Sequence, residues 1–261
     1  ASAAVCRLRS ADAVTCSTHH CSALVVGNAN YTRGALPSAA RRDTEDVAAA
    51  LEKLGFQVGR LFDGTKKQMK NAVKAFLKDV RPGGVVLVYF IGHGFQLDGT
   101  NHLLPVDYPM DQAAAAVEKA VAVPWLLQAL GKRKAAVNVV VLDACRPSPF
   151  RPKAAVEGLA PMVAPLHSLV ALSATPGSVR WLPASAPEAG SLYTRRLLEQ
   201  LSEPQLQVEE VFKRLRKRIV NETGGRQIPW ESSLLVEDFV PAGGEAVAAG
   251  APLQQEEEEE S

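Results

Sequence analysis

The chain has 261 residues, of which 47% are hydrophobic and 22% are charged, and its formal net charge is +1. This composition is typical of a soluble globular protein with one sizeable domain. It argues against a membrane protein, because no apolar run approaches the roughly 20 residues that a spanning helix needs, and the small net charge gives no reason to expect nucleic-acid binding.

The two ends of the chain differ in composition from its body. Residues 1–21 are rich in Ala, Ser and Thr and hold three of the four cysteines, and residues 242–261 contain a run of glutamates. We expect a disordered leader and a disordered acidic tail there, although the leader also fits the remnant of an organelle-targeting segment. Because Cys145 alone lies in the body, the cysteines favour a reducing, cytoplasmic location over a disulfide-built domain.

Apolar runs and helical patterns alternate along residues 22–241. The runs 85–91 and 137–142 are almost wholly apolar and predict central strands buried on both faces. The alternation predicts an α/β fold with a mostly parallel central sheet and helices on both faces. The other expected elements, in chain order, are a strand at 22–26, a helix at 43–54, a strand at 56–62, a helix capped by Thr65 and stopped at Arg81, a helix at 124–130, a strand at 169–173 and helices at 192–201 and 208–220.

Reactive side chains follow the two most apolar runs. His93 stands between two glycines just after the first, and Cys145 follows the second. Because ligands bind beyond the carboxyl ends of parallel strands, and because a neighbouring His can deprotonate a Cys thiol, we predict Cys145 as the nucleophile and His93 as its base. The amides of Gly94 and Cys145 are the expected oxyanion donors. The alternative is an inert buried cysteine beside an ordinary loop histidine.

Residues 22 to about 240 resemble the caspase-like superfamily of cysteine peptidases, which includes caspases, metacaspases and paracaspases. The resemblance implies a caspase-like fold with a large-subunit-like part at 22–175, a loop at 176–190 and a small-subunit-like part at 191–241. It places the catalytic dyad on His93 and Cys145. The matching segments, in the family's order, are Ala23–Tyr31, Tyr89–Gly94, Asn101–Asp107, Val141–Arg146 and Gln227–Leu234.

Within the superfamily the chain looks most like the paracaspases and their orthocaspase relatives. Metacaspases carry acid clusters after the histidine and after the cysteine, and these clusters form a calcium site. The segments that follow His93 and Cys145 here lack them. We therefore expect no metal site and no cofactor.

The resemblance also implies a specificity. Metacaspases and paracaspases bind Arg or Lys before the scissile bond with acidic side chains, and Asp143 and Asp43 match those acids. For Asp43 the alternative is a plain helix N-cap. The stretch 174–181, where some paracaspases have a third acid, contains Arg180 instead. The pocket is then either less acidic than in those relatives or partly occupied by Arg180 in the resting state.

The connections after the nucleophile contain Arg151, Lys153 and Arg180. Because we expect these segments to be exposed, slow self-cleavage is predicted at one of them, first of all at Arg180. The predicted function is a calcium-independent endopeptidase, monomer or homodimer, that cleaves proteins or peptides after Arg or Lys. The alternatives are a catalytically silent caspase-like interaction module and a redox-sensing cysteine protein, although the body lacks a resolving cysteine for the latter.

Two further clusters are interpreted as non-functional. The stretch Cys16–Cys21 holds two cysteines and two histidines, but zinc ligands are usually paired across a longer loop. Lys213, Arg214, Arg216, Lys217 and Arg218 lie opposite apolar positions of one predicted helix, which indicates a solvated helix face rather than a nucleic-acid site.

Overall fold

The computed structural model describes residues 13–32, 34–108, 113–144, 157–181 and 190–243. Its centre is a six-stranded sheet with the strand order β2-β1-β3-β7-β8-β9. The first five strands run parallel, and β9 is antiparallel to β8. The bounds of the strands are β1 Cys21–Gly27, β2 Gln57–Phe62, β3 Val85–Ile91, β7 Val137–Asp143, β8 Ser168–Leu172 and β9 Trp230–Ser233.

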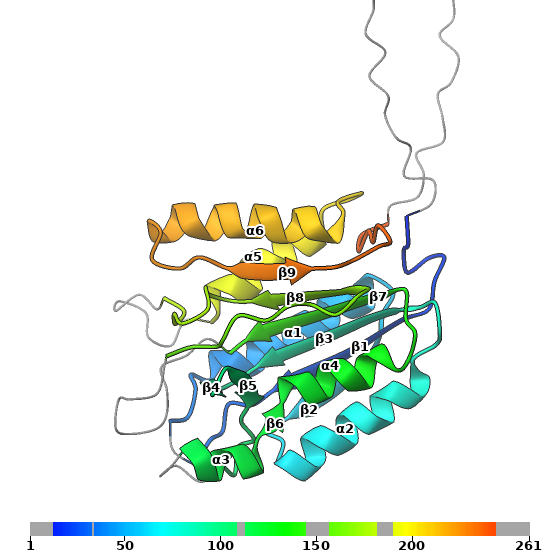
Figure 1. Ribbon diagram of the computed structural model, residues 1–261. Coiled ribbons are helices and arrows are strands. Elements are labelled where there is room, and N and C mark those ends of the chain that lie inside the picture. The colour runs from blue at the N-terminus through cyan, green and yellow to red at the C-terminus, as the bar shows by residue number, and fades with distance from the viewer. Residues whose placement is uncertain (1–12, 33, 109–112, 145–156, 182–189, 244–261) are drawn as a thin grey trace, which may run out of the picture.

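Helices cover both faces of this sheet (Figure 1). Alternate residues of each central strand point to opposite faces, so that Tyr89 of β3 packs into one hydrophobic core and Phe90 into the other. The first core includes α1, α5 and α6, and the second includes α2 and α4. The expected α/β fold with a mostly parallel sheet is therefore confirmed. The helix bounds are α1 Ala39–Lys53, α2 Lys66–Asp79, α4 Val123–Gly131, α5 Leu192–Leu201 and α6 Val208–Thr223.

The predicted elements agree with the structure except at a few ends. Thr65 forms a capping box with Gln68 at the start of α2, as its position indicated. In contrast, α1 begins at Ala39 and not at residue 43, because the alanines ahead of Asp43 continue the helix. Asp43 consequently lies inside α1, and its interpretation as a helix N-cap is wrong.

A second, antiparallel sheet was not predicted. It consists of β4 (Gly94–Leu97), β5 (Thr100–Leu103) and β6 (Val121–Ala122), and α3 (Ala113–Lys119) precedes its last strand. These strands are short and lack a clear period-two pattern, which explains why the sequence did not indicate them. The small sheet starts directly after His93 and thus limits where that residue can lie.

The ordered domain starts earlier than the expected boundary at residue 22. Val14 bridges to Phe239 near the C-terminal end of the domain. Its amide donates a hydrogen bond to the Asp238 carbonyl at 2.7 Å, and its carbonyl accepts one from the Val240 amide at 3.0 Å. The expectation of a disordered leader is therefore wrong for residues 13–21. The Val14 side chain is buried in the core. Residues 1–12 and 244–261 lie outside the described part.

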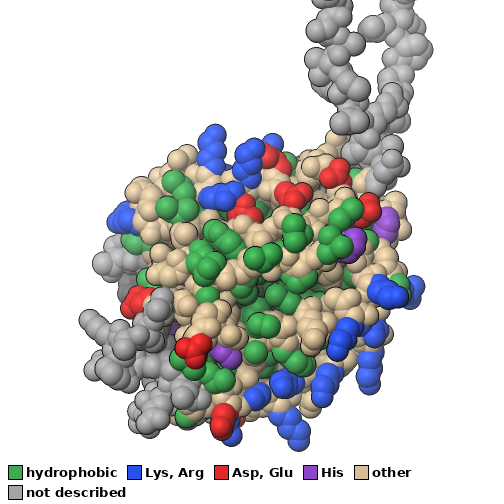
Figure 2. Space-filling view, in the orientation of Figure 1, with side chains coloured by type: hydrophobic (Ala, Val, Ile, Leu, Met, Phe, Trp, Pro, Cys, Tyr) green, Lys and Arg blue, Asp and Glu red, His purple; other side chains and the backbone are tan. Residues whose placement is uncertain are grey.

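Charged side chains gather on two parts of the surface. Figure 2 shows Lys and Arg over α6 at the upper edge and over α2 at the lower right edge. On α6, the apolar side chains Val211, Phe212 and Leu215 are buried on the opposite side, so the predicted amphipathic helix is confirmed. Among the described residues, no helix is both long and apolar enough to cross a membrane.

Candidate active site

His93 lies just beyond the carboxyl end of β3, beside the end of β7. The two strands are paired in parallel, with Ile91 opposite Asp143, and the Gly92 amide donates a hydrogen bond to the Asp143 carbonyl at 3.4 Å. His93 follows two residues after Ile91. Cys145 itself lies outside the described residues, which stop at Ala144 on this side. The strand register sets Ile91, two residues before His93, opposite Asp143, two residues before Cys145 in the sequence.

The imidazole of His93 is held in a fixed orientation. Its Nε2 lies 2.7 Å from the Gly34 carbonyl oxygen. Because a carbonyl oxygen can only accept, Nε2 carries the proton in the neutral ring and Nδ1 is the nitrogen that can take another. The side chain is 8% exposed. The sequence did not predict this contact, since Gly34 lies in an irregular loop far from His93 in the chain.

Tyr31 fixes the backbone of the same residue. Its hydroxyl accepts a hydrogen bond from the His93 amide at 2.7 Å and donates one to the Leu104 carbonyl at 3.3 Å. The two rings also contact each other, with centroids 4.6 Å apart and planes inclined by 57°. Tyr31 ends one of the segments that carry the family resemblance, which is the signal that could have identified it as a site residue.

Gly94, the predicted oxyanion donor, is packed against the end of β7. A Cβ atom at this position would lie 3.0 Å from the Ala144 Cβ and 3.0 Å from the Leu159 side chain. A larger residue would therefore force the backbone away from the residue that precedes Cys145. The structure thus brings Gly94 next to Ala144, the residue before the predicted nucleophile in the sequence.

The two predicted specificity acids, Asp43 and Asp143, are brought together from α1 and β7. Asp143 is fully buried, and its Oδ2 accepts a hydrogen bond from the Thr194 hydroxyl at 3.4 Å. Asp43 Oδ2 accepts one from the Ser191 amide at 2.6 Å. Ser191 and Thr194 belong to the first turn of α5 and its cap, and nothing in the sequence marked them as site residues.

Burial raises the pKa of the Asp43 carboxyl to about 6. The hydrogen bond from the Ser191 amide opposes this shift, the charge of Asp143 adds to it, and the charge of Arg180 lowers it. Two acids and one guanidinium thus influence one another in a buried region. Two buried acids are costly to fold unless opposite charge or hydrogen-bond donors compensate them.

The expectation that Arg180 lies in an exposed loop is wrong. Of the segment 176–181, Gly177 and Ser178 are exposed, but Arg180 is only 7% exposed. The segment is held against the domain on both sides of Arg180, because the Gly177 amide donates to the Leu159 carbonyl at 2.9 Å and the Trp181 amide donates to the Gln227 side chain at 3.2 Å. The other two predicted cleavage positions, Arg151 and Lys153, lie outside the described residues.

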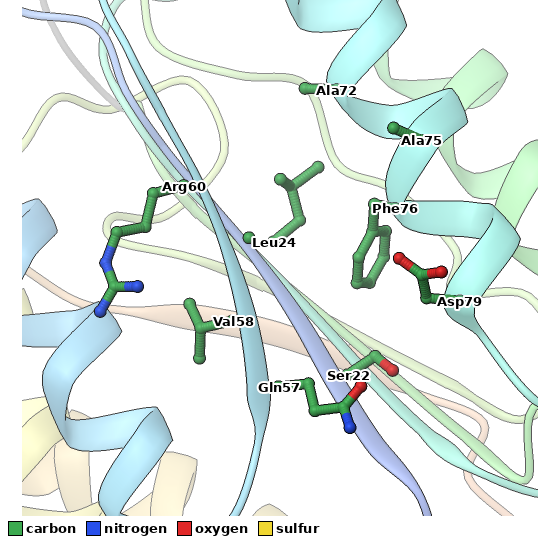
Figure 3. Close-up of a pocket in the computed structure, with 10 residues that line it drawn as sticks. Ser22, Leu24, Gln57, Val58, Arg60, Ala72, Ala75, Phe76 and Asp79 are labelled. Carbon is green, nitrogen blue, oxygen red and sulfur yellow. The ribbon is translucent and has the colours of Figure 1, made fainter.

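A cavity beside the edge strand β2 is separate from this site. A cavity of about 360 Å³ lies between α2 and the strands β1 and β2, and residues such as Leu24, Arg60, Phe76 and Asp79 line it (Figure 3). It includes Ser22 and Gln57, which stand at the amino ends of their strands. In parallel sheets, this is the end opposite to that of His93.

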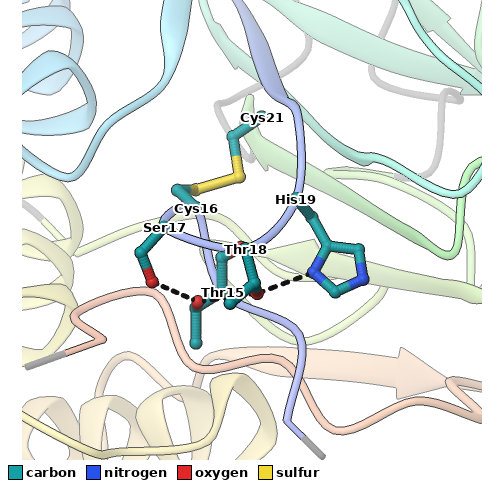
Figure 4. The surroundings of a disulfide bond; sticks show 6 residues. All are labelled: Thr15, Cys16, Ser17, Thr18, His19 and Cys21. Atoms are coloured by element: carbon teal, nitrogen blue, oxygen red, sulfur yellow. Dashed lines mark hydrogen bonds between the residues drawn. A yellow bond between two sulfur atoms is a disulfide. The ribbon is translucent and has the colours of Figure 1, made fainter. Parts of the chain in front are cut away.

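The N-terminal cysteines are paired with each other rather than free. Cys16 and Cys21 form a disulfide beside His19 (Figure 4). The expectation of reduced thiols is wrong for this pair, because the tight turn ahead of β1 brings residues five apart to a Cα separation of 5.4 Å. The two sulfurs are thereby removed as metal ligands, and no group of three His, Cys, Asp or Glu side chains suited to a metal occurs among the described residues.

Comparison with known proteins agrees with this geometry. The family model described as the caspase domain matches residues 20–240. The mucosa-associated lymphoid tissue lymphoma translocation protein 1 of Homo sapiens is 33% identical over 124 residues, and its Mus musculus homologue is 32% identical over 124 residues. Each match covers 48% of this chain but only 15% and 14%, respectively, of those much longer proteins.

The predicted resemblance to the caspase-like superfamily is confirmed by these matches, and the two relatives agree with its paracaspase-type branch. The parallel sheet, the histidine after its third strand and the family match at 20–240 lead to one conclusion. The chain belongs to the caspase-domain family of cysteine peptidases.

Proposed function

We propose that the protein is an endopeptidase that cleaves after Arg or Lys through a dyad of Cys145 and His93. The observation that supports the proposal is the strand register, which pairs Ile91, two residues before His93, with Asp143, two residues before Cys145 in the sequence. The orientation of His93 supports it, because Nε2 faces the Gly34 carbonyl and the basic nitrogen is Nδ1. No described feature favours the silent-module alternative.

The reaction follows from these groups. His93 Nδ1 takes the proton of the Cys145 thiol, and the thiolate sulfur attacks the carbonyl carbon of the scissile peptide. The amides of Gly94 and Cys145 are the proposed donors to the resulting oxyanion. The imidazolium then returns the proton to the leaving amine, a thioester remains, and water activated by His93 hydrolyses it to release the acid product and the free thiol.

The proposed specificity rests on Asp43 and Asp143. Both carboxylates are buried, and Asp143 Oδ1 accepts no hydrogen bond from any described residue. A guanidinium or ammonium of a substrate would supply the missing donors and offset the like charges. An aspartate before the scissile bond would add a third negative charge to the same region. We also propose that the reaction needs no calcium, since the segments after His93 and Cys145 lack an acid cluster.

The test uses peptides that differ only in the residue before the scissile bond, with Arg, Lys or Asp at that position. Wild-type protein should cleave the Arg and Lys peptides, in the presence of calcium or of EDTA. Cys145→Ala and His93→Ala should each reduce kcat/KM by at least about 1,000-fold. His19→Ala, at the opposite end of the sheet, is the control and should retain full activity. Hydrolysis by pure Cys145→Ala protein, or a preference for the Asp peptide, would contradict the proposal.

A further inference from the structure

The loop that follows β1 is joined to the end of β3, directly ahead of His93. The Asn28 amide donates a hydrogen bond to the Ile91 carbonyl at 2.9 Å. The Asn28 side chain, which is fully buried, donates to the Leu104 carbonyl at 2.9 Å and accepts from the Gly64 amide at 2.9 Å. The start of this loop is therefore fixed to the strand that leads into the predicted base.

The same loop supplies hydrogen-bond partners for both the backbone and the ring of His93. The Tyr31 hydroxyl accepts from the His93 amide, and the Gly34 carbonyl faces its Nε2, each at 2.7 Å. The His93 carbonyl accepts from the Leu104 amide at 2.9 Å, and the Leu104 carbonyl accepts from the Tyr31 hydroxyl at 3.3 Å. Tyr31, His93 and Leu104 thus form a closed ring of hydrogen bonds.

The Tyr31 hydroxyl reaches this position because residue 92 is a glycine. A Cβ atom on Gly92 would lie 2.7 Å from the hydroxyl oxygen and 2.6 Å from the Phe90 ring, which is too close for either contact. Tyr31 is only 4% exposed, and Tyr108 packs against its ring with centroids 5.7 Å apart. The hydroxyl is therefore held between the backbone of the base and a packed aromatic cluster.

Asp63, in the turn after β2, holds the loop from its other side. Its Oδ1 accepts hydrogen bonds from the amides of Ala29 and Asn30, both at 2.8 Å. Its own amide donates to the Gly27 carbonyl at 2.9 Å. Hydrogen bonds from amides to a carboxylate are stronger than those between neutral groups. Asp63 thereby fixes the residues that immediately precede Tyr31.

We propose that Tyr31 is a positioning residue for the base, because its hydroxyl fixes the backbone of His93, and that Asp63 holds the loop that carries Tyr31 and the Gly34 carbonyl. This inference rests on the proposed function, in which His93 takes the proton of the Cys145 thiol. Proton transfer requires a base held within hydrogen-bond reach of the thiol. Loss of the hydroxyl releases the His93 amide and lets the imidazole move away from that position.

The first experiment measures the proton transfer without substrate. Iodoacetamide alkylates the thiolate and not the thiol, so the pH dependence of alkylation at Cys145 reports how readily His93 takes its proton. The modified peptide is quantified by mass spectrometry, because the chain holds other cysteines. In the wild type the midpoint should lie below about pH 7. In Tyr31→Phe it should rise toward about pH 8.5, where an isolated thiol ionises, and alkylation at about pH 6.5 should slow on the order of tenfold.

The second experiment uses the active enzyme and an Arg peptide. Tyr31→Phe should lower kcat about 10- to 100-fold, because a small displacement of a catalytic group has a large effect on rate. KM should stay within about threefold, since the proposed specificity acids are unchanged. Tyr108→Phe removes a hydroxyl from the neighbouring ring and is the matched control. It should change neither kcat nor the alkylation rate by more than about twofold.

A second pair of variants tests the loop itself and carries the test if Tyr31→Phe does not fold. Asp63 has a positive φ of 50°, which both glycine and asparagine tolerate. Asp63→Gly removes the acceptor of the two amides, so it should lower kcat and slow alkylation in the same direction as Tyr31→Phe. Asp63→Asn keeps an acceptor oxygen and should recover most of that loss.

The outcomes separate this inference from the proposed function. A wild-type alkylation midpoint near pH 8.5 would reject the proposed dyad and the inference with it. A low midpoint that is unchanged in Tyr31→Phe, with unchanged kcat, would overturn the positioning role alone. An equal loss in Tyr108→Phe would also overturn it, because general packing of the aromatic cluster would then explain the effect. A low wild-type midpoint that rises in Tyr31→Phe and Asp63→Gly but not in Tyr108→Phe would support the proposal.

Discussion

The charged side chains at the carboxyl edge of the sheet are buried, whereas those along α6 are exposed to solvent. Asp143 is 0% exposed, and Asp43 and Arg180 are each 7% exposed. On α6, the side chains of Lys213 and Arg214 are 72% and 53% exposed and pair with Glu210 of the same helix. The two groups have similar residue types but very different surroundings.

This difference in exposure determines how much each group of charges affects the stability of the protein. An exposed ion pair is screened by water and contributes little to stability. Two buried acids near each other oppose folding unless they are compensated. The buried acids belong to the same end of the sheet as His93, and under the proposed function they bind a basic side chain. The following predictions test that contrast, from the largest expected effect to the smallest.

The largest effect is expected at the fully buried acid. Asp143→Asn keeps the size of the side chain but removes its charge, so a bound Arg side chain loses a buried partner. We expect kcat/KM for Arg and Lys peptides to fall on the order of 100-fold or more, with little change in thermal stability. Asp238→Asn, far from the site, is the control. An unchanged kcat/KM would show that Asp143 does not contact the substrate.

A smaller, pH-dependent effect is expected at Asp43. Because its folded-state pKa is raised from 3.8 to about 6, chiefly by burial, the folded protein binds this proton more tightly than the unfolded chain. Its contribution to the free energy of unfolding is therefore fully present below about pH 4 and is lost as the pH rises through about 6. The charges of Asp143, Arg180 and Asp46 and the Ser191 amide act on it in the folded state.

The measurement is urea unfolding of wild type and Asp43→Asn at several pH values. The advantage of the wild type over the variant should shrink between pH 4 and pH 7, since asparagine does not titrate. Asp46→Asn, an exposed acid on the same helix, is the control for a general charge effect. Parallel stability curves for wild type and Asp43→Asn would mean that Asp43 is not desolvated as its burial indicates.

Self-cleavage gives a test of the contrast between exposed and buried basic residues. We still propose slow processing in the connections that follow the nucleophile, at Arg151, Lys153 or Arg180. The burial of Arg180 predicts that cleavage there is slow and is not accelerated by raising the protein concentration, because another molecule cannot reach it. New termini are mapped by mass spectrometry in wild type and Cys145→Ala. Equal cleavage in both would indicate a contaminating protease.

The smallest effect is expected on α6. Lys213→Ala and Arg214→Ala each remove an exposed ion pair, and the free energy of unfolding should change by less than about 0.5 kcal/mol. Peptidase activity should be unaffected. A loss of more than about 2 kcal/mol would show that this face packs against something in the protein, and it would remove the contrast between the two groups of charges.

Much of the fold was determined by local sequence pattern. The runs that became β3 and β7 are almost wholly apolar, and such runs fit only the middle of a covered parallel sheet. The helices α5 and α6 were predicted from their apolar stripes, and Thr65 was predicted as a cap from its chemistry. The position of His93 just after a central strand was predicted from the same pattern, because the apolar run ends at Ile91 and Gly92 follows it.

Other features depend on contacts between residues distant in sequence. The short strands β4 to β6 are stabilised by pairing with one another and carry little pattern of their own. The disulfide between Cys16 and Cys21 depends on the turn that joins them, and the burial of Arg180 depends on a segment held by Leu159 and Gln227. Neither could be read from the residues alone, since composition shows which groups can pair but not which groups meet.

The sequence by itself thus determined the class of fold, the order of its main elements and the family, together with the identity of the candidate catalytic residues. Only the tertiary structure decided how these residues are held. It turned Nε2 of His93 toward the Gly34 carbonyl, joined the Tyr31 hydroxyl to the His93 backbone and brought the Ser191 amide to Asp43. The physical reason is that hydrophobic periodicity is a local property of a chain, whereas hydrogen bonds and buried charges are satisfied by partners that folding alone brings within reach.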